Sequence, residues 1–443
     1  MKSKQNQSSV ALMKHTKGRV SSVKPLLHCL WLTTCNSSKM KFMMRAALGV
    51  WILSAVLCVE TAEEQDTAGN STAQKTALVF SSNKELGFNL YRKMASHADF
   101  QGKNIFFSPV SVSVALAALC VGAGGETHKQ LFSGLGFNSS LLTQTDVDHA
   151  FRVLLSKSNE DSSEGTAVFV DSRFKPQPEF LDTLKNSYFG DGFNVDFTKP
   201  TDSINTINSY VAEKTKGKID KLVENLDANT IMYLLSYIYY KGKWATPFDP
   251  ELTRKDEFIV DENTKVPVQM MYMKKHVDVY YDQGLNTSVL HLSFNSSKSI
   301  VLLLPENMAT LENAISPGHF TKWLKWMKSR RYEIYVPKFS IKTSYKLNNI
   351  LTEMGMTDMF TDRADLSGIA PGQKLVVSEV VHQATLDLDE SGATASGATG
   401  IGITLLSFQH TPVLKFNKAF MLAILDRNTQ NILFTGKIIN PNI

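Results

Sequence analysis

The feature that most constrains how this chain can fold is a stretch near its C-terminus, DESGATASGATGIGITLLSFQHTPVLKF. From Gly392 to Pro412 this stretch contains no Lys, Arg, Asp or Glu. Structureless loops of more than about 12–15 residues are uncommon in compact domains, and disordered segments are usually charged and poor in branched residues. Because this segment is uncharged and contains Thr, Ile and Leu, its composition indicates a strand that has no partner in a sheet.

Alternation along the segment supports this interpretation, because successive side chains of a strand point to opposite faces. Small residues occupy both faces: Ala393, Ala395, Gly397 and Thr399 on one, and Thr394, Ser396, Ala398 and Gly400 on the other. Neither face has a charge to desolvate, and no proline interrupts the backbone hydrogen bonds. We therefore expect a segment that can be inserted into an existing sheet, followed by larger residues, ITLLSF, that a protease could bind.

The first 62 residues have the features of a targeting sequence. They hold nine Lys or Arg and one acid, Glu60, so the rest of the chain is slightly acidic although the whole carries a net charge of +5. The rest of the chain therefore lacks the basic character suited to nucleic acid. MKFMMR followed by the apolar run Ala46–Val59 predicts a secretory signal peptide over 40–62, cleaved between Cys58 and Ala62. The alternative is a membrane anchor, but a spanning helix needs about 20 apolar residues.

Residues 1–39 have no periodicity and precede a second potential start at Met40, so we interpret them as an upstream extension that arises from an over-extended gene model. A polar linker, EEQDTAGNSTAQK, covers 63–75. The remaining residues, 76–443, show neither repeats nor an internal linker and are predicted to form one large domain. A hydrophobic fraction of 43% and a charged fraction of 20% are ordinary for a soluble globular protein.

The cysteines indicate a protein without a disulfide framework. Three of the four, Cys29, Cys35 and Cys58, lie in the leader, and only Cys120 remains, inside the apolar run VALAALCVGAG. A secreted chain with one buried cysteine depends on its core for stability. Secretion also makes the sequons after the leader credible glycosylation sites on surface loops. Their asparagines are Asn70, Asn138, Asn286 and Asn295.

The pattern of apolar residues changes from helical to strand-like along the chain. ELGFNLYRKMAS has helical periodicity, and SPVSVSVALAALCVGAG opens with Ser108 and Pro109, a capping residue and a proline at the first helical position. From about Thr230 the composition predicts strands, with hairpins at SVLHLSF-NSSKS-IVLLLPEN and VLKFNKAFMLAIL-DRNTQ-NILFTGKII. Pro337 limits where YEIYVPKFSIKTS can sit in a sheet. Helices first and strand pairs later predict an α+β fold.

Motifs for cofactor, metal and enzyme chemistry are absent from the sequence. SGATGIG resembles a dinucleotide-binding turn, but too few residues separate Gly402 from Pro412 for the helix that such a turn needs. No two histidines after the leader have metal-ligand spacing, and neither a Gly-x-Ser-x-Gly motif nor a Cys–His motif occurs. We expect no cofactor and no metal. His382, taken alone on its alternating strand pattern, is interpreted as a satisfied core histidine.

A basic stretch, KWLKWMKSRR, is interpreted as a helical patch. Its charged residues are Lys322, Lys325, Lys328, Arg330 and Arg331. Two hypotheses remain for this patch. It is either a solvated helix face, with Trp323 and Trp326 on or near the apolar side, or a site for a sulfated polysaccharide such as heparin.

From about Thr76 to its end, the chain resembles the serpin family, specifically the secreted group that contains α1-antitrypsin and α1-antichymotrypsin. The segments that carry the resemblance match that family's motifs in type and order: NIFFSPVSVSVALAALCVGAGGETHKQL, YYKGKW, PKFSI, ADLSGI, SEVVHQATLDLDESG and FNKAFMLAIL…LFTGKIINP. The resemblance implies N-terminal helices, a large mixed five-stranded main sheet, further antiparallel sheets and an exposed reactive loop near the C-terminus. It also implies a monomer.

The same resemblance implies functional residues. The hinge that enters the main sheet would be Glu390, Ser391, Gly392, Ala393, Thr394, Ala395, Ser396, Gly397, Ala398 and Thr399. Counting on from Glu390 in the family's register puts the attacked bond between Leu406 and Ser407, with Leu405 and Phe408 as neighbouring alternatives. Ser108, Ser111 and His382 match the polar cluster beneath the point where the sheet opens. Trp244 matches the tryptophan near the top of the sheet.

The chain departs from the family pattern at three places. The family's asparagine in the polar cluster is Ser236, so the hydrogen bonds of that cluster must differ. The proline of FNKPF is Ala419, which we expect to matter little. Gly400 and Gly402 lie just before the attacked bond, and each adds loop entropy of about 0.5–1 kcal/mol relative to alanine. These glycines lower the expected inhibitory efficiency.

The function implied is that of a secreted serine protease inhibitor that acts as a suicide substrate, not of an enzyme. Leu406 suits the hydrophobic specificity slot of a chymotrypsin-like protease, and proteases of chymotrypsin, cathepsin G, chymase or elastase type remain open as targets. The alternative is a non-inhibitory serpin that carries a hormone or other small ligand. The small, uncharged hinge favours the inhibitor, because a carrier needs no efficient insertion.

Overall fold

The computed structural model describes residues 71–156, 162–391 and 411–443. Within these residues the chain begins with a helix over 71–96. The α-helices that follow are α2 (Pro109–Gly122), α3 (Gly125–Gly134), α4 (Gln144–Leu155), α5 (Pro178–Tyr188), α6 (Pro200–Lys214), α7 (Met308–Ala314), α8 (Pro317–Trp326) and α9 (Asn348–Glu353). Short 3-10 turns are η1 (Ala98–Phe100), η2 (Pro250–Leu252) and η3 (Asp358–Phe360).

The α2 helix is the most deeply buried of these elements. Every residue of α2 except Val121 is buried, which agrees with its sequence, apolar nearly all round. The helix begins as predicted, because the Ser108 hydroxyl accepts a hydrogen bond from the backbone N–H of Ser111 at 3.1 Å and Pro109 occupies the first turn. Cys120 is buried within this helix.

The strands form one continuous path of hydrogen-bonded neighbours. In chain order they are β1 (Ile105–Phe107), β2 (Ser162–Asp171), β3 (Asp191–Val195), β4 (Met232–Lys241), β5 (Arg254–Ile259), β6 (Lys265–Asp282), β7 (Thr287–Ser293), β8 (Lys298–Pro305), β9 (Lys328–Lys346), β10 (Glu379–Leu388), β11 (Val413–Lys415), β12 (Phe420–Asp426) and β13 (Ile432–Ile438). Their order in space is β1-β13-β12-β8-β7-β6-β9-β10-β4-β2-β3, with β5 on β6 and β11 on β9.

The five strands β9-β10-β4-β2-β3 form the main sheet. In it β10 is parallel to β4 and β2 is parallel to β3, whereas β9 is antiparallel to β10 and β2 is antiparallel to β4. The sheet is therefore mixed. The long strand β9 leaves it and pairs through its first half with β6, which leads to the antiparallel strands β7, β8, β12 and β13.

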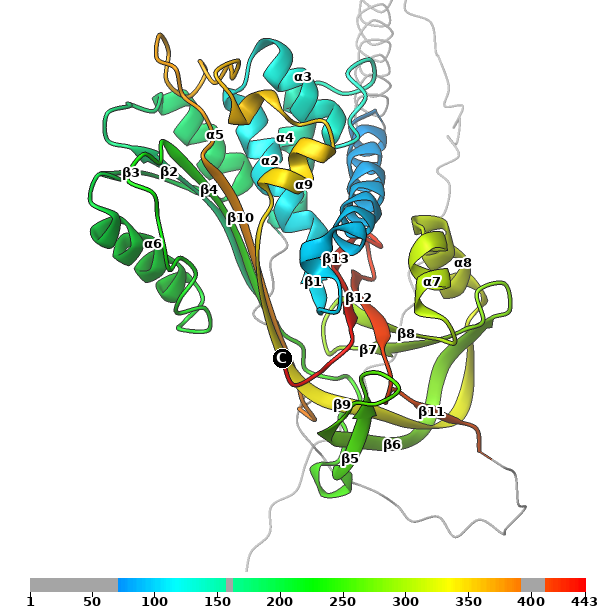
Figure 1. Cartoon of the computed structure of the whole chain (residues 1–443). Helices are drawn as coiled ribbons and strands as arrows, with labels where there is room; N and C mark the ends of the chain where they lie inside the picture. The colour runs from blue at the N-terminus through cyan, green and yellow to red at the C-terminus, as the bar shows by residue number, and fades with distance from the viewer. Residues whose placement is uncertain (1–70, 157–161, 392–410) are drawn as a thin grey trace, which may run out of the picture. The chain divides into compact units, whose positions relative to one another are not determined.

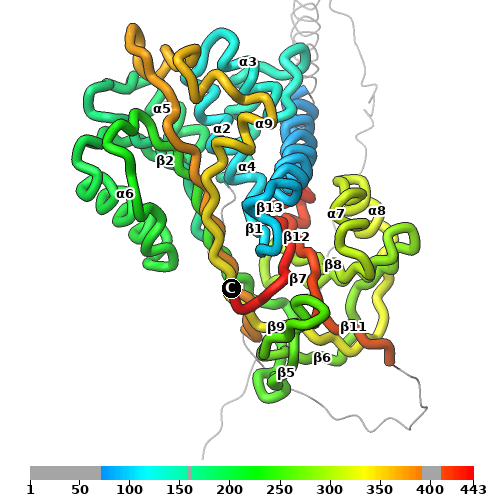
Figure 2. The backbone as a smooth tube through the Cα atoms, viewed as in Figure 1, coloured from blue at the N-terminus to red at the C-terminus, as the bar shows by residue number. Residues whose placement is uncertain are grey.

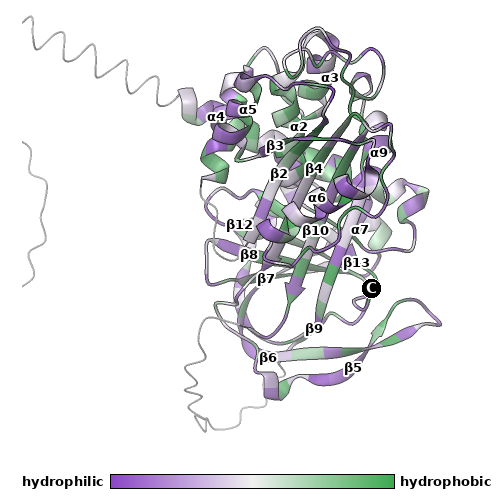
Figure 3. Ribbon diagram, turned by 90° about the vertical axis from the view of Figure 1, so that its left-hand side faces the viewer, coloured by the Kyte–Doolittle hydropathy of each residue, from purple (hydrophilic) through white to green (hydrophobic). Residues whose placement is uncertain are grey.

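Helices cover both faces of the main sheet. The α2, α3, α4, α5 and α9 helices lie on one face and α6 lies on the other (Figures 1 and 2). The view of Figure 3, turned toward the α6 side, shows this helix in front of the main-sheet strands. Ile207 and Val211 of α6 are fully buried in a cluster with β2, β3 and β4 residues. Apolar side chains therefore pack against both faces of the sheet, although its strands also contain buried polar residues such as Thr166, Ser236 and His382.

The structure confirms the α+β fold and most of the predicted elements. β7 pairs with β8, and β12 with β13, as antiparallel neighbours. Pro337 is paired with Met270 of β6, outside the half of β9 that pairs with β10, as the prediction for proline required. The helical residues 71–75 fall inside the segment that was predicted as linker.

The predicted order of helices before strands is only partly right. β2 and β3 lie among the early helices, and α7, α8 and α9 lie among the later strands. β2 escapes a search for alternation because its first four residues are polar or glycine and only half-buried, while its last six are buried on both faces. A short apolar run of this kind cannot be distinguished from a helix segment by its period.

Candidate functional site

A polar cluster lies at the middle of the main sheet, where α2 begins. His382 of β10 is paired across strands with Ser236 of β4, and its Nδ1 lies 2.9 Å from the Ser236 hydroxyl oxygen. The backbone N–H of Ser108 donates to His382 Nε2 at 3.0 Å. All three residues are buried, and His382 is completely buried. One imidazole therefore links β10, β4 and the start of α2.

The geometry determines the tautomer of His382. A backbone N–H can only donate, so Nε2 accepts, and the proton of the neutral ring sits on Nδ1 and is donated to Ser236. Burial lowers the pKa of His382 to about 3, because a charged ring in the interior would lose its hydration. The ring is therefore neutral at physiological pH and uses both nitrogens.

Ser111, which was predicted for this cluster, and Trp244, which was predicted near the top of the sheet, form no hydrogen bond with the imidazole in the described part of the chain. Ser111 contributes its backbone N–H to the Ser108 cap, and its own hydroxyl has no hydrogen-bond partner in the described part of the chain. Trp244 follows β4, where its indole N–H donates to the carbonyl of Asp389 at 2.6 Å and its backbone N–H donates to the carbonyl of Ser391 at 3.0 Å. The predicted residues therefore divide into two sites along β10.

The second site is a set of acidic residues at the C-terminal end of β10. Asp387 accepts hydrogen bonds from Tyr239 of β4 at 2.9 Å and from Ser340 of β9 at 2.6 Å. Asp389 forms an ion pair with Lys241 of β4 at 2.9 Å. We name Asp387, Asp389 and Glu390, together with their partners, the hinge clamp. The clamp holds the end of β10 to both neighbouring strands.

Glu390 completes the hinge clamp. Its carboxylate accepts from Lys338 Nζ of β9 at 2.8 Å and from the Thr253 hydroxyl at 2.9 Å. Burial acts to raise the pKa of Glu390, but the hydrogen bonds from Lys338 and Thr253 outweigh burial and hold the pKa below its ordinary value. The residue therefore stays ionised, and its charge is balanced inside the clamp.

Sequence reasoning singled out Glu390 but missed the residues that hold it. Lys338 lies 52 residues away in the chain and Thr253 lies 137 residues away. The only available signal was the alternation of PKFSI, which placed Lys338 on a strand without naming the neighbour of that strand. Partners of this kind follow from sheet order, which local pattern does not specify.

The two central strands of the main sheet are in direct contact. β10 and β4 pair in parallel from Glu379–Tyr233 to Asp387–Lys241. Beyond the end of this ladder lie Glu390 and Ser391, the first two residues of the predicted hinge. A strand that entered the sheet between β4 and β10 would have to break this ladder, the His382–Ser236 contact and half of the hinge clamp.

The interpretation of KWLKWMKSRR as one helical patch is wrong. Helix α8 ends at Trp326, and β9 begins at Lys328. The basic residues therefore divide between two elements: Lys322 and Lys325 lie on the helix, and Lys328, Arg330 and Arg331 lie on the strand. Successive strand residues point to opposite faces, so the two arginines do not share a face.

The remaining residues of this stretch also differ from expectation. Lys322 is engaged in an ion pair with Asp282 at 3.0 Å. Trp323 is fully buried, but Trp326, which was expected on or near the apolar side, is 58% exposed. His276 of β6 faces Arg331 across the strands, so the strand part of the patch gains a neighbour that sequence reasoning missed.

Three of the predicted glycosylation sites fall within the described residues. Asn138, Asn286 and Asn295 are exposed and lie outside helices and strands, as expected for acceptor asparagines on surface loops. Glycosylation at these positions stays a prediction. Asn70 lies outside the described residues.

Several further predictions concern residues outside the described part of the chain. They are the leader over 1–62, the hinge residues Gly392 to Thr399, the glycines Gly400 and Gly402, and the bond between Leu406 and Ser407 with its neighbours Leu405 and Phe408. Among the described residues we find no group of three or more His, Cys, Asp or Glu arranged to hold a metal ion. The same residues include no helix that is both long and apolar enough to cross a membrane.

The chain is similar to known proteins over most of its length. The family model described as serpin, serine protease inhibitor, matches residues 81–441. Serpin A3-6 of Bos taurus is 38% identical over 89% of this chain and 97% of its own length. Alpha-1-antiproteinase of Rattus norvegicus is 36% identical over 89% of this chain and 98% of its own.

Two solved structures are also similar to this chain over most of its length. Human thyroxine-binding globulin in complex with thyroxine superimposes with a TM-score of 0.77 at 34% identity, covering 83% of this chain and 100% of that one. Human glycosylated kallistatin superimposes with a TM-score of 0.76 at 35% identity, covering 83% of this chain and 99% of that one.

The protein has an α+β fold in which β4 and β10 pair directly within a mixed main sheet. The end of β10 leads into the uncharged segment that begins at Gly392. That arrangement, and the match over 81–441, show that the chain belongs to the serpin family.

Proposed function

We propose that the protein is a secreted serine protease inhibitor that acts as a suicide substrate. A chymotrypsin-like protease attacks the bond between Leu406 and Ser407 through its serine and forms an acyl-enzyme. The hinge from Glu390 to Thr399 then enters the main sheet between β4 and β10. The attached protease is carried along before deacylation. Membership of a family described as serine protease inhibitors supports the proposal.

The observation that carries the proposal is the direct parallel pairing of β4 with β10. The hinge leaves the C-terminal end of β10, so a hinge that turns back along the sheet runs antiparallel to both strands. Insertion then exchanges one parallel ladder for two antiparallel ladders, and antiparallel pairing is slightly more stable per residue. A sheet closed in this way therefore has a more stable state available once the loop is cut.

The hydrophobic Leu406 favours chymotrypsin, cathepsin G, chymase or elastase-type enzymes as targets. Secretion follows from the signal peptide predicted over 40–62, and glycans at Asn138, Asn286 and Asn295 fit their exposure. The protein acts as a monomer. The strand part of the basic patch, now with His276, is the remaining candidate for binding heparin-like polysaccharide.

The test is to mix the purified protein with chymotrypsin and run a denaturing gel. We expect a band that survives boiling at the summed mass of both proteins, and a released C-terminal fragment that starts at Ser407. Cleavage without such a band would contradict the proposal that the protein is an inhibitor. A fragment that starts at another residue would show that a different bond is attacked.

The second candidate function is carriage of a small ligand, and the similarity to thyroxine-binding globulin favours it. A carrier would be cleaved by chymotrypsin without trapping it. Thyroxine titrated against the protein with tryptophan fluorescence as the signal tests this alternative. Saturable binding together with absent trapping would favour the carrier over the inhibitor.

A further inference from the structure

A row of three side chains lies at the end of the hairpin formed by β6 and β7. Tyr281 of β6 is paired with Ser288 of β7, and Ser288 is paired with Leu304 of β8. Directly opposed residues of antiparallel strands share a face of the sheet. The next row on this face is buried in an apolar cluster and consists of Val279, Leu290 and Leu302. The row that contains Tyr281 is therefore the rim at which this buried face reaches the surface.

Tyr281 is the exposed member of this row. The residue is 53% exposed, whereas Leu304 is half-buried and packs against the apolar cluster. The preceding residue, Tyr280, points to the other face of β6, where Lys322 Nζ lies 5.7 Å from the centre of its ring. Tyr281 therefore presents an aromatic ring to solvent beside an apolar rim.

Asn286 lies directly beside this ring. It is the asparagine of a predicted glycosylation site, Asn-Thr-Ser over 286–288. The Tyr281 hydroxyl donates a hydrogen bond to the side-chain oxygen Oδ1 of Asn286 at 3.3 Å. The backbone carbonyl of Asn286 accepts from the N–H of Glu306 at 3.0 Å. Its φ of 43° lies in the left-handed region, which asparagine tolerates better than most residues. Asn286 is therefore held at the tip of the hairpin through its backbone and its side chain.

The hydrogen bond to Tyr281 determines which atom of the Asn286 amide faces away from the ring hydroxyl. Oδ1 accepts that bond, so the amide nitrogen Nδ2, to which an N-glycan is attached, is left for the glycan. The first sugar of an N-glycan is N-acetylglucosamine, and its bond to Nδ2 places it next to the phenol ring. One face of this sugar presents C–H groups, which the negative face of an aromatic ring attracts.

We propose that Tyr281 is a binding platform for the first N-acetylglucosamine of a glycan on Asn286. The C–H face of the sugar packs on the Tyr281 ring and covers the rim beside Leu304. This contact removes apolar area of both partners from water, so the glycan stabilises the hairpin. The inference rests on the glycosylation proposed above for Asn286, and it adds the residue that orients the glycan.

The aromatic residues that precede the other described glycosylation sites are buried. Phe294 precedes Asn295 and is 1% exposed, and Phe137 precedes Asn138 and is 4% exposed. Neither ring presents an open face to a sugar on the asparagine that follows it. A glycan on Asn295 is therefore an internal reference for the glycan on Asn286.

Mass spectrometry of the protein secreted by cultured mammalian cells is the first measurement. We expect a glycan on the peptide that contains Asn286. An unoccupied Asn286 would overturn both its proposed glycosylation and the platform. An occupied Asn286 supports the glycosylation, and variants of Tyr281 then test the platform separately.

Ser288→Ala prevents glycosylation but keeps Asn286 and its hydrogen bond, so it provides the unglycosylated background. In the glycosylated protein, Tyr281→Ser should lower the unfolding temperature at a fixed heating rate by about 2–4 °C. Tyr281→Phe should lower it by less than half as much, because the ring remains. With Ser288→Ala present, Tyr281→Ser should lower it by less than about 1 °C. Equal losses in the two backgrounds would overturn the platform and leave the glycosylation of Asn286 standing.

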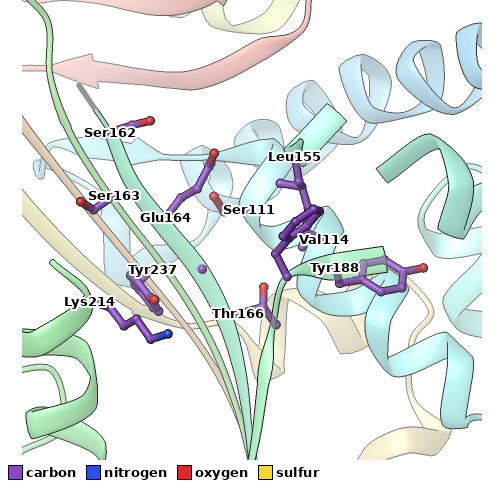
Figure 4. A pocket seen from close by; sticks show the side chains of 12 residues that line it. Ser111, Val114, Leu155, Ser162, Ser163, Glu164, Thr166, Tyr188, Lys214 and Tyr237 are labelled. Carbon is purple, nitrogen blue, oxygen red and sulfur yellow. The ribbon is translucent and has the colours of Figure 1, made fainter. Parts of the chain in front are cut away.

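Phe189→Ser is the matched control. Phe189 is 54% exposed and follows Tyr188 at the end of α5, where both residues line a cavity of about 200 Å³ between helices and β2 (Figure 4). Phe189→Ser should change the unfolding temperature by the same amount in the glycosylated protein and with Ser288→Ala present. A control that depends on the glycan as strongly as Tyr281→Ser does would overturn the specific role of Tyr281.

NMR gives a direct readout of the contact. An endoglycosidase first trims each glycan to a single N-acetylglucosamine. The ring protons of the sugar on Asn286 should then resonate upfield of those on Asn295, because they lie over an aromatic ring. Tyr281→Ser should abolish this difference, and Phe189→Ser should preserve it. Coinciding signals of the two sugars in the wild type would overturn the proposed contact.

Discussion

At the scale of single residues, the main sheet is held closed by a few buried polar contacts. His382 joins β10 to β4 through Ser236 and to α2 through the Ser108 backbone. Because both ring nitrogens are used and the ring is neutral, the contact depends on one protonation state. The replacement of the family's asparagine by Ser236 leaves a shorter side chain, yet the hydroxyl still reaches the imidazole.

The first prediction concerns the pH dependence that His382 imposes. The histidine titrates near 6.5 in the unfolded chain and near pH 3 in the folded protein, so the unfolded chain binds more protons between these values. The contribution of His382 to the free energy of unfolding is complete above about pH 6.5. It falls by about 1.4 kcal/mol per pH unit as the pH drops toward 3. Thermal scans at one heating rate should show the unfolding temperature decreasing below pH 6.5.

The matched variant is His382→Gln, which keeps a polar side chain without a group that titrates here. Its unfolding temperature should start lower at pH 7.5 and change less between pH 6.5 and 5 than that of the wild type. If the unfolding temperatures of the two proteins changed equally with pH, His382 would not be the group that controls this pH dependence.

The second prediction concerns Glu390 in the hinge clamp. Glu390→Gln keeps the shape but removes the charge that Lys338 and Thr253 hydrogen-bond. Lys338 is nearly half exposed, so we expect a modest loss of about 1 kcal/mol, or about fivefold faster opening. Hydrogen exchange of the last β10 amides measures the opening. Glu251→Gln, exposed in the nearby η2 turn, is the control, and equal effects of both variants would exclude a clamp at Glu390.

At the scale of elements, a helix or strand could be predicted where one sequence pattern covers the whole element. It could not be predicted where its boundaries or contacts depend on which strands pair. α2, β4 and the two hairpins follow from their own residues. The boundary between α8 and β9 does not, because Lys and Arg suit either structure and the start of β9 is defined by its pairing with β6. For the same reason Glu390 was found from sequence and Lys338 was not, since their contact depends on β9 and β10 being neighbours.

The third prediction tests insertion of the hinge as a strand element. If Ala393 belongs to the face that becomes buried, Ala393→Arg places a charge in the interior at a cost of several kcal/mol and stalls insertion. The variant should be cleaved by chymotrypsin with little or no trapped complex on a denaturing gel. Ala393→Ser, at the same position and without a charge, is the control and should trap at close to the wild-type level. Normal trapping by Ala393→Arg would show that the register is wrong.

At the scale of the whole molecule, the proposed mechanism requires a native state that is not the most stable arrangement of its own chain. The parallel β4–β10 ladder, the imidazole beneath it and the hinge clamp oppose opening. Two antiparallel ladders would favour the inserted state. The stability of the uncut protein is therefore set by the rate of opening rather than by equilibrium.

The last prediction follows from this difference between the two states. Cleavage between Gly400 and Phe408 by a cysteine protease frees the hinge without a serine acyl-enzyme. The hinge then adds a strand to the main sheet, and each new backbone hydrogen bond contributes about 0.5–1.5 kcal/mol. Since 1 kcal/mol shifts the unfolding temperature of a large domain by about 2–4 °C, the cleaved protein should unfold more than about 10 °C above the intact one. Cleaved Ala393→Arg should show no such rise, because its hinge cannot enter the sheet. An unchanged unfolding temperature for the cleaved wild type would exclude insertion of the hinge. Carriage of a small ligand would then be the better account of the protein's function.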